Sequence, residues 1–437
     1  MTARPPVLHL ASEPAPEPCR PLLEAPVRFA DDHLGVLHVR DHLDEHRAAF
    51  GRRPRLSADE VLGLLDATAL TGRGGGHFPV ARKWRTTRDA VRATGRTAVV
   101  VANAGEGEPA SAKDAALLVA RPHLVLDGLA TAAETVGAGD VVVWTHGDAH
   151  ELHRVLAGAL AERRAAGLVE PSVRLVSGPG RYLSGEASAV VRALSGGPAL
   201  PEFRRRPAAV EGVRGRPTVV NNVETLARVG LLARTGATGA TGAGTSLLTV
   251  LAARRRTVVE VPATALLADA ARAGGWHGAP PQAVLLGGYG GSWVPWSEAA
   301  GLRVDEVALR EAGLSLGAGV LALLPAGACG LAETARVSAY LAASSARQCG
   351  PCVFGLPAIS GVVEALVRGD ARKADLRRLQ RFAGEVSGRG ACHHPDGAVR
   401  MTLSALRTFA GDVERHRRRR PCAGVDHPPV LPVPVTP

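Results

Sequence analysis

Short β-branched and apolar runs alternate with longer amphipathic stretches in the first half of this chain. The short runs lie at 97–102, 140–145 and 173–176, and each has the length of a buried strand. Helical periodicity occupies the stretches between them, at 118–136 and 148–166. Strands that alternate with helices are typical of a mostly parallel sheet covered on both faces. The pattern therefore predicts an α/β domain whose ligands bind beyond the carboxyl ends of its strands.

The pattern changes on either side of this domain. Residues 1–55 are rich in Pro and Arg and predict an irregular N-terminal extension. Residues 245–330 predict a hairpin, a short helix and further strands, which make a small α+β module. Residues 331–415 predict a bundle of four helices joined by short loops. These helices are expected at 331–343, 356–367, 373–386 and 398–415. The tail, 416–437, is predicted to be disordered.

Composition narrows the class of protein. Of the 437 residues, 46% are hydrophobic and 3% are aromatic, so a globular core would consist mainly of Ala, Val and Leu. No apolar run reaches the ~18 residues that a membrane span needs, and the Pro-rich start is unlike a secretory signal. We expect a cytoplasmic protein, peripheral to a membrane only through partner subunits. The net charge of +11 is spread without interleaved aromatic residues, which argues against nucleic-acid binding.

The strongest local motif is the turn Thr71-Gly-Arg-Gly-Gly-Gly-His-Phe-Pro. Consecutive glycines let a backbone come close to a phosphate and point several amides at it. The turn follows no clear strand, so it does not match the dinucleotide-binding fingerprint, and an ordinary flexible loop remains an alternative. Lys83 follows it and is one of only three lysines in the chain. A compact cation at this place suits a phosphate site.

Three further loops carry polar residues near predicted strands or helix starts. They span 103–114, 178–186 and 220–225. Each alone is open to a simpler interpretation, as solvated surface for the acidic first loop or as helix caps for the paired Asn of the third. Together with the glycine turn, they indicate a binding site at one edge of the sheet.

The six cysteines include a CxxC pair, Cys349 and Cys352, with Cys392 forty residues later. In a large cytoplasmic protein these are expected to be thiols or metal ligands rather than disulfides. Pro within the pair and helices around it favour a metal-type turn over a thioredoxin-like motif.

In this order, the four loops and the cysteine motif resemble the NADH-binding flavoprotein subunit of respiratory complex I. Its relatives in NAD-linked hydrogenases and formate dehydrogenases share the pattern, and the resemblance covers about residues 56–415. It implies an FMN-binding α/β domain at 56–240 and a β-grasp-like (SLBB-type) module at 245–330. It also implies a helical iron–sulfur-binding domain at 331–415.

The resemblance implies that the loops hold FMN and NAD(H) or NADP(H). Glu106 and Lys83 are implied to act in catalysis, by setting the charge and hydrogen bonding around the flavin ring and nicotinamide. The cofactor-binding residues that carry over are Gly72, Arg73, Gly74, Gly75, Phe78, Lys83, Asn103, Glu106, Glu108, Tyr182, Gly185, Glu186, Val220, Asn221, Asn222 and Thr225.

The chemistry that the resemblance implies is hydride transfer from NAD(P)H to FMN, followed by single electrons to an iron–sulfur cluster. The expected partners are other electron-transfer subunits, or a ferredoxin-like or quinone-linked acceptor. Two other functions remain: an FMN protein that takes electrons from a protein partner without binding nicotinamide, and an assembly subunit without catalysis.

The chain departs from the family pattern at the cluster motif. Ala346 stands where the family has its first cysteine, which leaves Cys349, Cys352 and Cys392 as the metal ligands. Three thiolates suit a 3Fe–4S cluster, or a 4Fe–4S cluster with a non-cysteine fourth ligand. The candidates for that ligand are His393, His394 and Cys422 in the tail. Loss of the cluster is the other interpretation.

The second departure concerns the nucleotide. Phe78 is kept, but Thr86 and Pro207 stand at two positions of adenine-stacking phenylalanines. Gly105 and Ala187 replace two carboxylates, and Arg204 stands at the position of a lysine. With a carboxylate lost and Arg204 to Arg206 nearby, NADPH or a non-nucleotide donor becomes an alternative to NADH.

Overall fold

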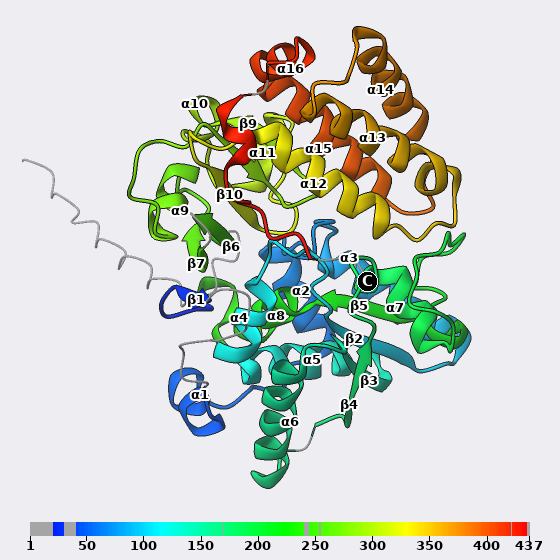
Figure 1. Cartoon of the computed structure of the whole chain (residues 1–437). Helices are drawn as coiled ribbons and strands as arrows, with labels where there is room; N and C mark the ends of the chain where they lie inside the picture. Colours follow the sequence, from blue (N-terminus) through cyan, green and yellow to red (C-terminus); the bar gives the residue numbers. More distant parts are fainter. Residues whose placement is uncertain are drawn as a thin grey trace, which may run out of the picture.

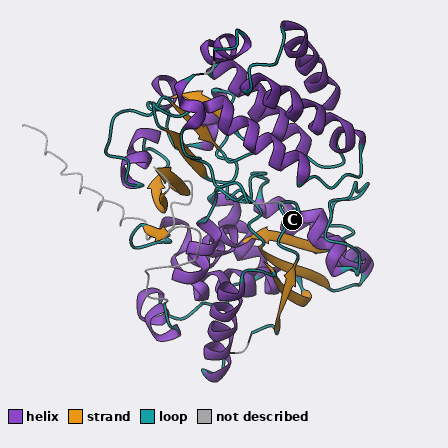
Figure 2. Cartoon of the chain, in the orientation of Figure 1, coloured by secondary structure: helices purple, strands orange, loops and turns teal. Residues whose placement is uncertain are grey.

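The computed structural model describes residues 21–29, 41–168, 170–239, 244–252, 255–420 and 422–434, which form two sheets and their surrounding helices. The first sheet contains β2 (Ala98–Ala104), β3 (Ala138–His146), β4 (Val173–Gly178) and β5 (Thr218–Asn222). Its order is β4-β3-β2-β5 and all its strand pairs are parallel (Figures 1 and 2). The predicted parallel sheet is confirmed, with β5 as an additional strand.

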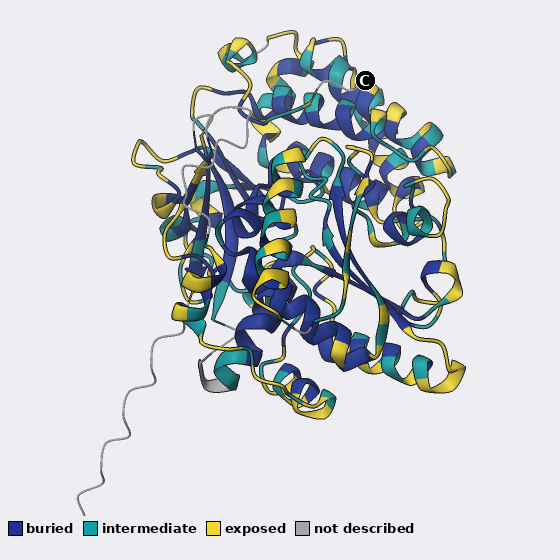
Figure 3. Ribbon diagram, turned by 90° about the horizontal axis from the view of Figure 1, so that it is seen from below, coloured by how far each residue is buried: buried dark blue, intermediate teal, exposed yellow. Residues whose placement is uncertain are grey.

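Helices cover both faces of this sheet, because alternate strand residues point to opposite sides. Val100, Ala102 and Val143 pack against α5 (Pro122–Val136) and α8 (Val223–Gly239). Val101, Val142 and Trp144 pack on the other face, with residues of α7 (Ala187–Leu194). Figure 3 shows the strands as a largely buried layer between these helices.

The helix expected at 118–136 is wrong in its bounds. The chain forms α4 (Lys113–Ala120) and then α5, which meet at an angle of 97°. Pro122 opens α5 at its first turn and cannot continue the preceding helix. Among the described residues, no single helix is long and apolar enough to cross a membrane; only this bent pair has the combined length and composition. The helix expected at 148–166 is observed as α6 (His150–Ala165).

The glycine turn lies between two helices, α2 (Ala58–Ala67) and α3 (Val80–Thr94). Ser57 and Glu60 form the capping box that starts α2, as the sequence predicts. Strand β5 is preceded by a short 3₁₀ turn, η1 (Val213–Gly215).

The second sheet has the order β1-β7-β6-β10-β8-β9. Its strands are β1 (Val27–Phe29), β6 (Thr245–Ala252), β7 (Arg255–Pro262), β8 (Ala283–Leu286), β9 (Ser292–Pro295) and β10 (Val320–Leu324). Only β6 and β10 are parallel neighbours. The helices α9 (Leu267–Ala273), α10 (Trp296–Ala299) and α11 (Glu306–Glu311) connect the strands.

The N-terminal extension is more ordered than expected. Among its described residues, β1 pairs with β7 and α1 (Leu43–Phe50) forms a helix. His46 of α1 is buried and hydrogen-bonds Asp127 at 2.8 Å. Since Asp127 also binds Arg163 and Arg234, this segment is tied to the core by a buried polar cluster.

The C-terminal region is helical, as predicted. It consists of α12 (Gly330–Ala343), α13 (Leu356–Val367), α14 (Lys373–Val386), α15 (His394–Thr408) and α16 (Ala410–Arg417), with a π-helical turn, η2 (Pro351–Gly355), before α13. The helix expected at 398–415 is interrupted at Phe409 and becomes α15 and α16. Figure 1 shows these helices together at one end of the molecule, with the parallel sheet at the other.

The prediction of a disordered tail is wrong for its described residues. Residues 422–434 include the 3₁₀ turn η3 (Ala423–Asp426), and Val430 and Leu431 are buried. The amides of these two residues donate to the buried carboxylate of Glu333 on α12, at 3.0 and 2.9 Å. Composition alone does not reveal these hydrogen bonds, because their acceptor, Glu333, lies far away in the chain.

Candidate functional site

The strand register brings the polar loop residues into one row at the carboxyl edge of the parallel sheet. Asn103 on β2 is paired with Asn222 on β5 and with Trp144 on β3. Trp144 is in turn paired with Val176 on β4, two residues before Gly178. The three predicted loops therefore start at neighbouring positions, which is where parallel sheets bind ligands.

The glycine turn packs on the start of α8 beside this edge. The amide of Gly72 donates to the Phe78 carbonyl at 2.9 Å, which closes the turn. The amide of Arg73 donates to Oγ1 of Thr225 at 2.9 Å. A Cβ at Gly74 would lie 3.3 Å from Cβ of Asn222, and Gly75 has a φ of +91°. Glycine is therefore needed at 75 for its backbone conformation and favoured at 74 by proximity.

The guanidinium group of Arg73 has one N–H donor without a partner. Its Nε is buried and has no hydrogen-bond partner among the described residues. Burial, together with the nearby charge of Arg228, lowers the pKa of Arg73 to about 10. A buried guanidinium with an unpaired N–H is stabilised by an anion such as a phosphate.

Lys83 supplies a second cation beside the sheet edge. Its Nζ donates to the carbonyl oxygen of Val220 at 3.0 Å, and burial lowers the pKa of its ammonium group. Its neighbour Trp84 donates from Nε1 to Oδ1 of Asn221 at 3.0 Å. The Asn221 side chain thus positions α3, while Lys83 stays available for an acidic group.

The first carboxylate of the acidic loop is directed at a helix start. Glu106 accepts from the amides of Asp114 and Ala115 at 3.3 Å each, and from the Ser111 hydroxyl. Burial, reinforced by the negative charge of Asp114, raises the pKa of Glu106 to about 7. Glu106 therefore holds the loop on α4, and its carboxyl is partly protonated near neutral pH.

The second carboxylate joins three parts of the chain. Glu108 accepts from the Tyr289 amide at 2.8 Å, from the Ala110 amide at 3.2 Å and from the Tyr182 hydroxyl at 3.4 Å. Burial raises the pKa of Glu108 to about 7. This carboxyl lies between the first sheet, the second sheet and the third loop.

The raised pKa of Glu108 predicts a pH effect on stability. The folded protein binds this proton more tightly than the unfolded chain, so the stabilisation is complete below pH 4.5 and lost as the pH rises through about 7. In urea titrations of flavin-free protein, Glu108→Gln should lose less stability than wild type between about pH 5 and about pH 8. The difference should be on the order of 2–3 kcal/mol. The exposed Glu298→Gln is the control, and parallel profiles for Glu108→Gln and wild type would contradict the assignment.

The acidic loop and the third loop interlock through glycines. Nδ2 of Asn103 donates to the Gly185 carbonyl at 2.7 Å. A Cβ at Gly107 would lie 2.1 Å from the Tyr182 carbonyl oxygen, and one at Gly185 would lie 2.0 Å from that of Gly105. No side chain fits at either glycine, so the two backbones are in direct contact.

Glu186 is used at a helix start. Its carboxylate accepts from the amides of Ser188 and Ala189 at 2.9 and 3.2 Å and caps α7. Lys113, the other lysine in a motif, is buried against Asp114 at 2.6 Å and Glu224 at 3.2 Å. Although burial lowers the pKa of Lys113, these carboxylates hold it above its usual value. Lys113 is therefore a buried structural cation.

Trp144 is a site residue that the sequence did not single out. Its buried ring lies against Gly105 and Gly178, where added Cβ atoms would be 3.0 and 2.0 Å from ring carbons. Its Nε1 is buried without a hydrogen-bond partner among the described residues. The missing side chain at Gly105 is thus filled by an indole, and the two glycines were the only sequence signal.

The cysteine motif faces the third loop. Cys349 precedes η2, and the amides of Ala391 and Cys352 donate to its sulfur. Burial raises the pKa of the buried Cys352 thiol to about 12. Burial also raises the pKa of Cys392, and the charge of Glu186 adds to this effect. The three cysteines and the Glu186 loop are therefore electrostatic neighbours.

All three tyrosines of the chain lie at this junction. The ring of Tyr182 is 5.8 Å from that of Tyr340 and 5.4 Å from that of His394. The ring of Tyr289 is 6.1 Å from that of Tyr340. These contacts join the acidic loop, through Glu108 and Tyr182, to the helices that carry the cysteines.

Cys422 does not lie with the cysteine motif, and its suggested role as a cluster ligand is wrong. Its sulfur is 3.4 Å from Nε2 of His416, near Cys329 at the start of α12. The CxxC motif follows the other end of α12, a helix about 20 Å long. His394 remains close: its Nε2 donates to the Leu341 carbonyl at 2.9 Å. His393 is fully exposed and contacts Asp396.

Comparison with known proteins shows which family models and relatives this chain is similar to. Residues 65–231 match the model of the Nuo51 FMN-binding domain, and residues 332–416 match that of the NADH-ubiquinone oxidoreductase-F iron-sulfur binding region. Both models describe parts of NADH-quinone oxidoreductase F subunits, and the chain is similar to these subunits over most of its length. It is 28% identical over 421 residues to the second such F subunit of Rhizobium meliloti (strain 1021), covering 92% of this chain and 99% of that one.

A second F subunit and a solved structure show the same similarity. The NADH-quinone oxidoreductase F subunit of Streptomyces coelicolor is 26% identical over 386 residues, 84% of this chain and 85% of its own length. An NAD+-reducing [NiFe]-hydrogenase in its H2-reduced state has a chain with a TM-score of 0.75 and 26% identity. The match covers 82% of this chain and 63% of the hydrogenase chain.

The residues at the sheet edge fit the FMN of this family. Among the described residues, the amides of Gly74 and Gly75 donate to no partner, Arg73 has an unpaired buried N–H, and Lys83 donates to an uncharged carbonyl. The unpaired Nε1 of Trp144 adds a donor at the row of strand ends. The cysteine motif fits a cluster, because amides donate to Cys349 as they do to cluster sulfurs.

The region expected to meet the nucleotide in this family is polar and open. Phe78 is 45% exposed and Phe203, absent from the sequence prediction, is 75% exposed. Arg204 is engaged: it contacts Glu202 at 3.1 Å and donates to the Glu211 carbonyl at 2.9 Å. Thr86 is half-buried, Pro207 is exposed, and neither offers an aromatic face.

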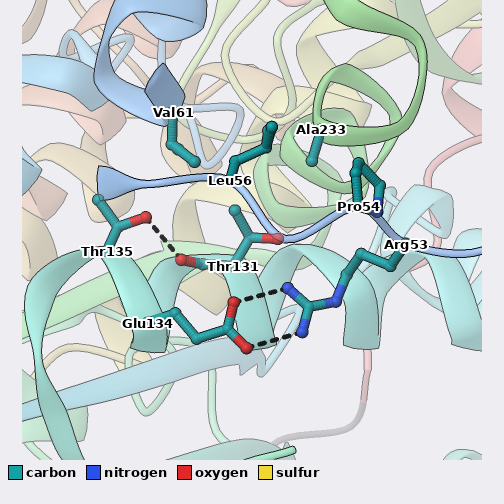
Figure 4. A pocket seen from close by; sticks show the side chains of 8 residues that line it. All are labelled: Arg53, Pro54, Leu56, Val61, Thr131, Glu134, Thr135 and Ala233. Atoms are coloured by element: carbon teal, nitrogen blue, oxygen red, sulfur yellow. Dashed lines mark hydrogen bonds and ion pairs between the residues drawn. The ribbon is translucent and has the colours of Figure 1, made fainter. Parts of the chain in front are cut away.

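A separate pocket lies away from the loops and the cysteine motif, between α2, α5 and α8 (Figure 4). Arg53 and Glu134 form two hydrogen bonds of 2.7 Å across it. The other lining residues are Pro54, Leu56, Val61, Thr131, Thr135 and Ala233. The pocket contains none of the predicted cofactor-binding residues, and its ion pair satisfies both charged groups.

Proposed function

We propose that this chain is an FMN- and iron–sulfur-dependent NADH dehydrogenase subunit that passes electrons to a partner protein. The observation that carries this proposal is the position of Tyr182. Its hydroxyl donates to Glu108 at the sheet edge, and its ring lies 5.4 Å from His394 beside Cys392. The loops that fit a flavin and the cysteines that fit a cluster therefore meet at one residue.

The chain's own residues have distinct tasks in this proposal. Gly72 closes the turn through its own amide, Gly74 and Gly75 offer backbone amides to the phosphate, and Arg73 supplies charge. Lys83 stabilises negative charge that develops beside β5, and Trp144 offers a hydrogen bond at the strand ends. Bound FMN would supply the capacity to take two electrons together and release them singly.

Asn103 fixes the loops through its side-chain amide, which donates to the Gly185 carbonyl, and Tyr182 and Gly185 fix them through close backbone contacts. Val220, Asn222 and Thr225 hold the glycine turn and Lys83 in place. Burial raises the pKa of Glu106 and of Glu108 to about 7, so each carboxyl is partly protonated at neutral pH and repels an anionic flavin less than a fully ionised carboxylate would.

Cys349, Cys352 and Cys392 would hold the cluster, with His394 as the fourth ligand. The Nε2 of His394 donates to a carbonyl, which leaves the Nδ1 lone pair available for iron. Burial lowers the pKa of His394, so the ring is neutral at neutral pH. His393 lacks this support, because its side chain is exposed.

NADH is favoured over NADPH as the donor. Arg204, which stands where a 2′-phosphate would need a free cation, is already paired with Glu202. A phosphate there would also be repelled by the Glu202 carboxylate. The exposed rings of Phe78 and Phe203 offer apolar faces for an adenine base.

The same proposal assigns a role to each part of the chain. The FMN-binding domain, 56–240, is followed by a β-grasp-like module, 245–330, whose hairpin β6–β7 and parallel neighbours β6 and β10 support this fold. The helices of 331–415 are proposed to form the iron–sulfur domain. The net charge of +11 suits an acidic ferredoxin-like partner or another electron-transfer subunit.

The decisive experiment is anaerobic stopped-flow mixing of the flavin-loaded protein with NADH and NADPH. NADH should bleach the flavin absorption, with a kcat/KM at least about tenfold higher than for NADPH, equivalent to about 1.4 kcal/mol. Equal rates with both would refute the donor assignment. Flavin that resists both, yet is reduced by a ferredoxin, would establish the nicotinamide-independent function. Failure to bind flavin would favour an assembly role.

A further inference from the structure

Cys329, His416 and Cys422 form a second cluster of metal-binding side chains, separate from the CxxC motif. They come from the residue before α12, from α16 and from the tail. Their ligand atoms all lie within 4.8 Å of one another. We propose that these three residues bind a zinc ion that fastens the C-terminal tail to the helical region.

The distances suit a single tetrahedral ion. The sulfurs of Cys329 and Cys422 lie 3.7 and 3.4 Å from Nε2 of His416. Zinc bonds of about 2.3 Å to sulfur and about 2.0–2.1 Å to nitrogen place the two ligand atoms about 3.5 Å apart in a tetrahedron. The three side chains therefore already have the spacing of a zinc site.

The tautomer of His416 is fixed in the form that binds metal. Its Nδ1 lies 3.1 Å from the Val367 carbonyl oxygen, which can only accept, so Nδ1 carries the proton. The lone pair is then on Nε2, the atom that faces both sulfurs. The Cys422 amide approaches this nitrogen at 3.3 Å and would give way to the ion. A metal-bound histidine that donates its other N–H to a carbonyl is the usual arrangement.

The surroundings bury two of the three ligands and give one sulfur an amide donor. Cys329 and His416 are buried, and the amide of Ala332 donates to the Cys329 sulfur at 3.4 Å at the start of α12. Binding releases one proton from each thiol and forms two Zn–S bonds and one Zn–N bond, and a water would complete the tetrahedron. The two thiolates balance the charge of Zn²⁺, so the buried group has no net charge. Soft thiolate ligands favour zinc over magnesium or calcium.

A bound zinc would have a structural consequence for the tail. Arg419 has a φ of +58°, which lets the chain turn back between His416 and Cys422. Beyond Cys422, the tail reaches Glu333 and its Pro432 carbonyl accepts from the Tyr289 hydroxyl. The zinc would thus hold Cys422, at the start of this segment, in the position from which the tail reaches Glu333.

The test is metal analysis of the intact holoprotein from zinc-supplemented cells. We expect about one zinc per chain, with X-ray absorption showing two sulfurs at about 2.3 Å and lighter atoms at about 2.0–2.1 Å. Cys422→Ser should lower bound zinc at least tenfold and leave iron and flavin unchanged. Cys349→Ala, the matched control, should lower iron and leave zinc unchanged.

Several results would overturn the proposal. They are wild-type protein without zinc, zinc that is retained in both Cys422→Ser and His416→Gln, and a zinc shell without sulfur. A mass smaller by two hydrogens, from a Cys329–Cys422 disulfide in freshly purified protein, would also overturn it. Because flavin and iron are measured in the same samples, failure of the zinc site is distinguishable from failure of the proposed function.

Discussion

Gly107→Ala should abolish flavin binding while the chain still folds. The new methyl group would lie 2.1 Å from the Tyr182 carbonyl oxygen, and the obstructing atom belongs to backbone that cannot rotate away. The acidic loop and the third loop must then separate. This separation displaces both Glu108 and Tyr182 from their present positions. Overpacking of this kind destabilises proteins by about 1–3 kcal/mol. We expect flavin occupancy below about a tenth of wild type, since a displacement of the loops removes several contacts at once.

Gly63→Ala is the control for this experiment, because its added Cβ meets nothing within 4 Å. It lies in α2 and should keep wild-type flavin content. Flavin absorption and thermal unfolding are measured on the same samples. Full flavin occupancy in Gly107→Ala would show that the two loops do not form the binding site.

Cys349→Ala should remove the iron–sulfur cluster and leave the flavin in place. The cysteine lies outside all four flavin loops, and a cluster held by three cysteines cannot spare one. We expect iron content and the electron paramagnetic resonance signal of reduced protein to fall at least about tenfold. NADH should still bleach the flavin, but electrons should no longer reach a ferredoxin at a comparable rate.

Cys422→Ser is the matched cysteine control, and its iron content should equal that of wild type. Unchanged iron in Cys349→Ala would refute the ligand assignment. Iron lost from Cys422→Ser as well would mean that the tail serves the cluster after all.

Much of the fold could be predicted because it is encoded locally. The β-branched runs of β2, β3 and β4 and the capping box of α2 each specify their element within a few residues. Strand β5 was missed because it is short and ends in two Asn, which also suit a helix cap. The tail was misjudged because burial of Val430 and Leu431 depends on Glu333, which lies 97 residues before Val430 in the chain.

The site residues were found more readily than their orientations. Sequence motifs identified Glu106, Glu186 and Asn221, but these side chains turn to helix starts and to Trp84. The direction of such a side chain depends on the helix that follows its loop, so the motif alone does not predict it. Trp144 was missed because its role arises from two glycines in other segments. Cys422 was placed wrongly because its neighbour, Cys329, belongs to no motif.

The confinement of all three tyrosines to one junction gives the protein a built-in optical reporter. Burial raises the phenol pKa of Tyr182, Tyr289 and Tyr340. Ionised tyrosine absorbs differently from the neutral ring, and no phenol elsewhere in the chain contributes. An alkaline titration that follows the absorption of ionised tyrosine therefore monitors the contact between the flavin loops and the cysteine-bearing helices. The onset of the signal marks the moment at which this electron-transfer junction opens to water.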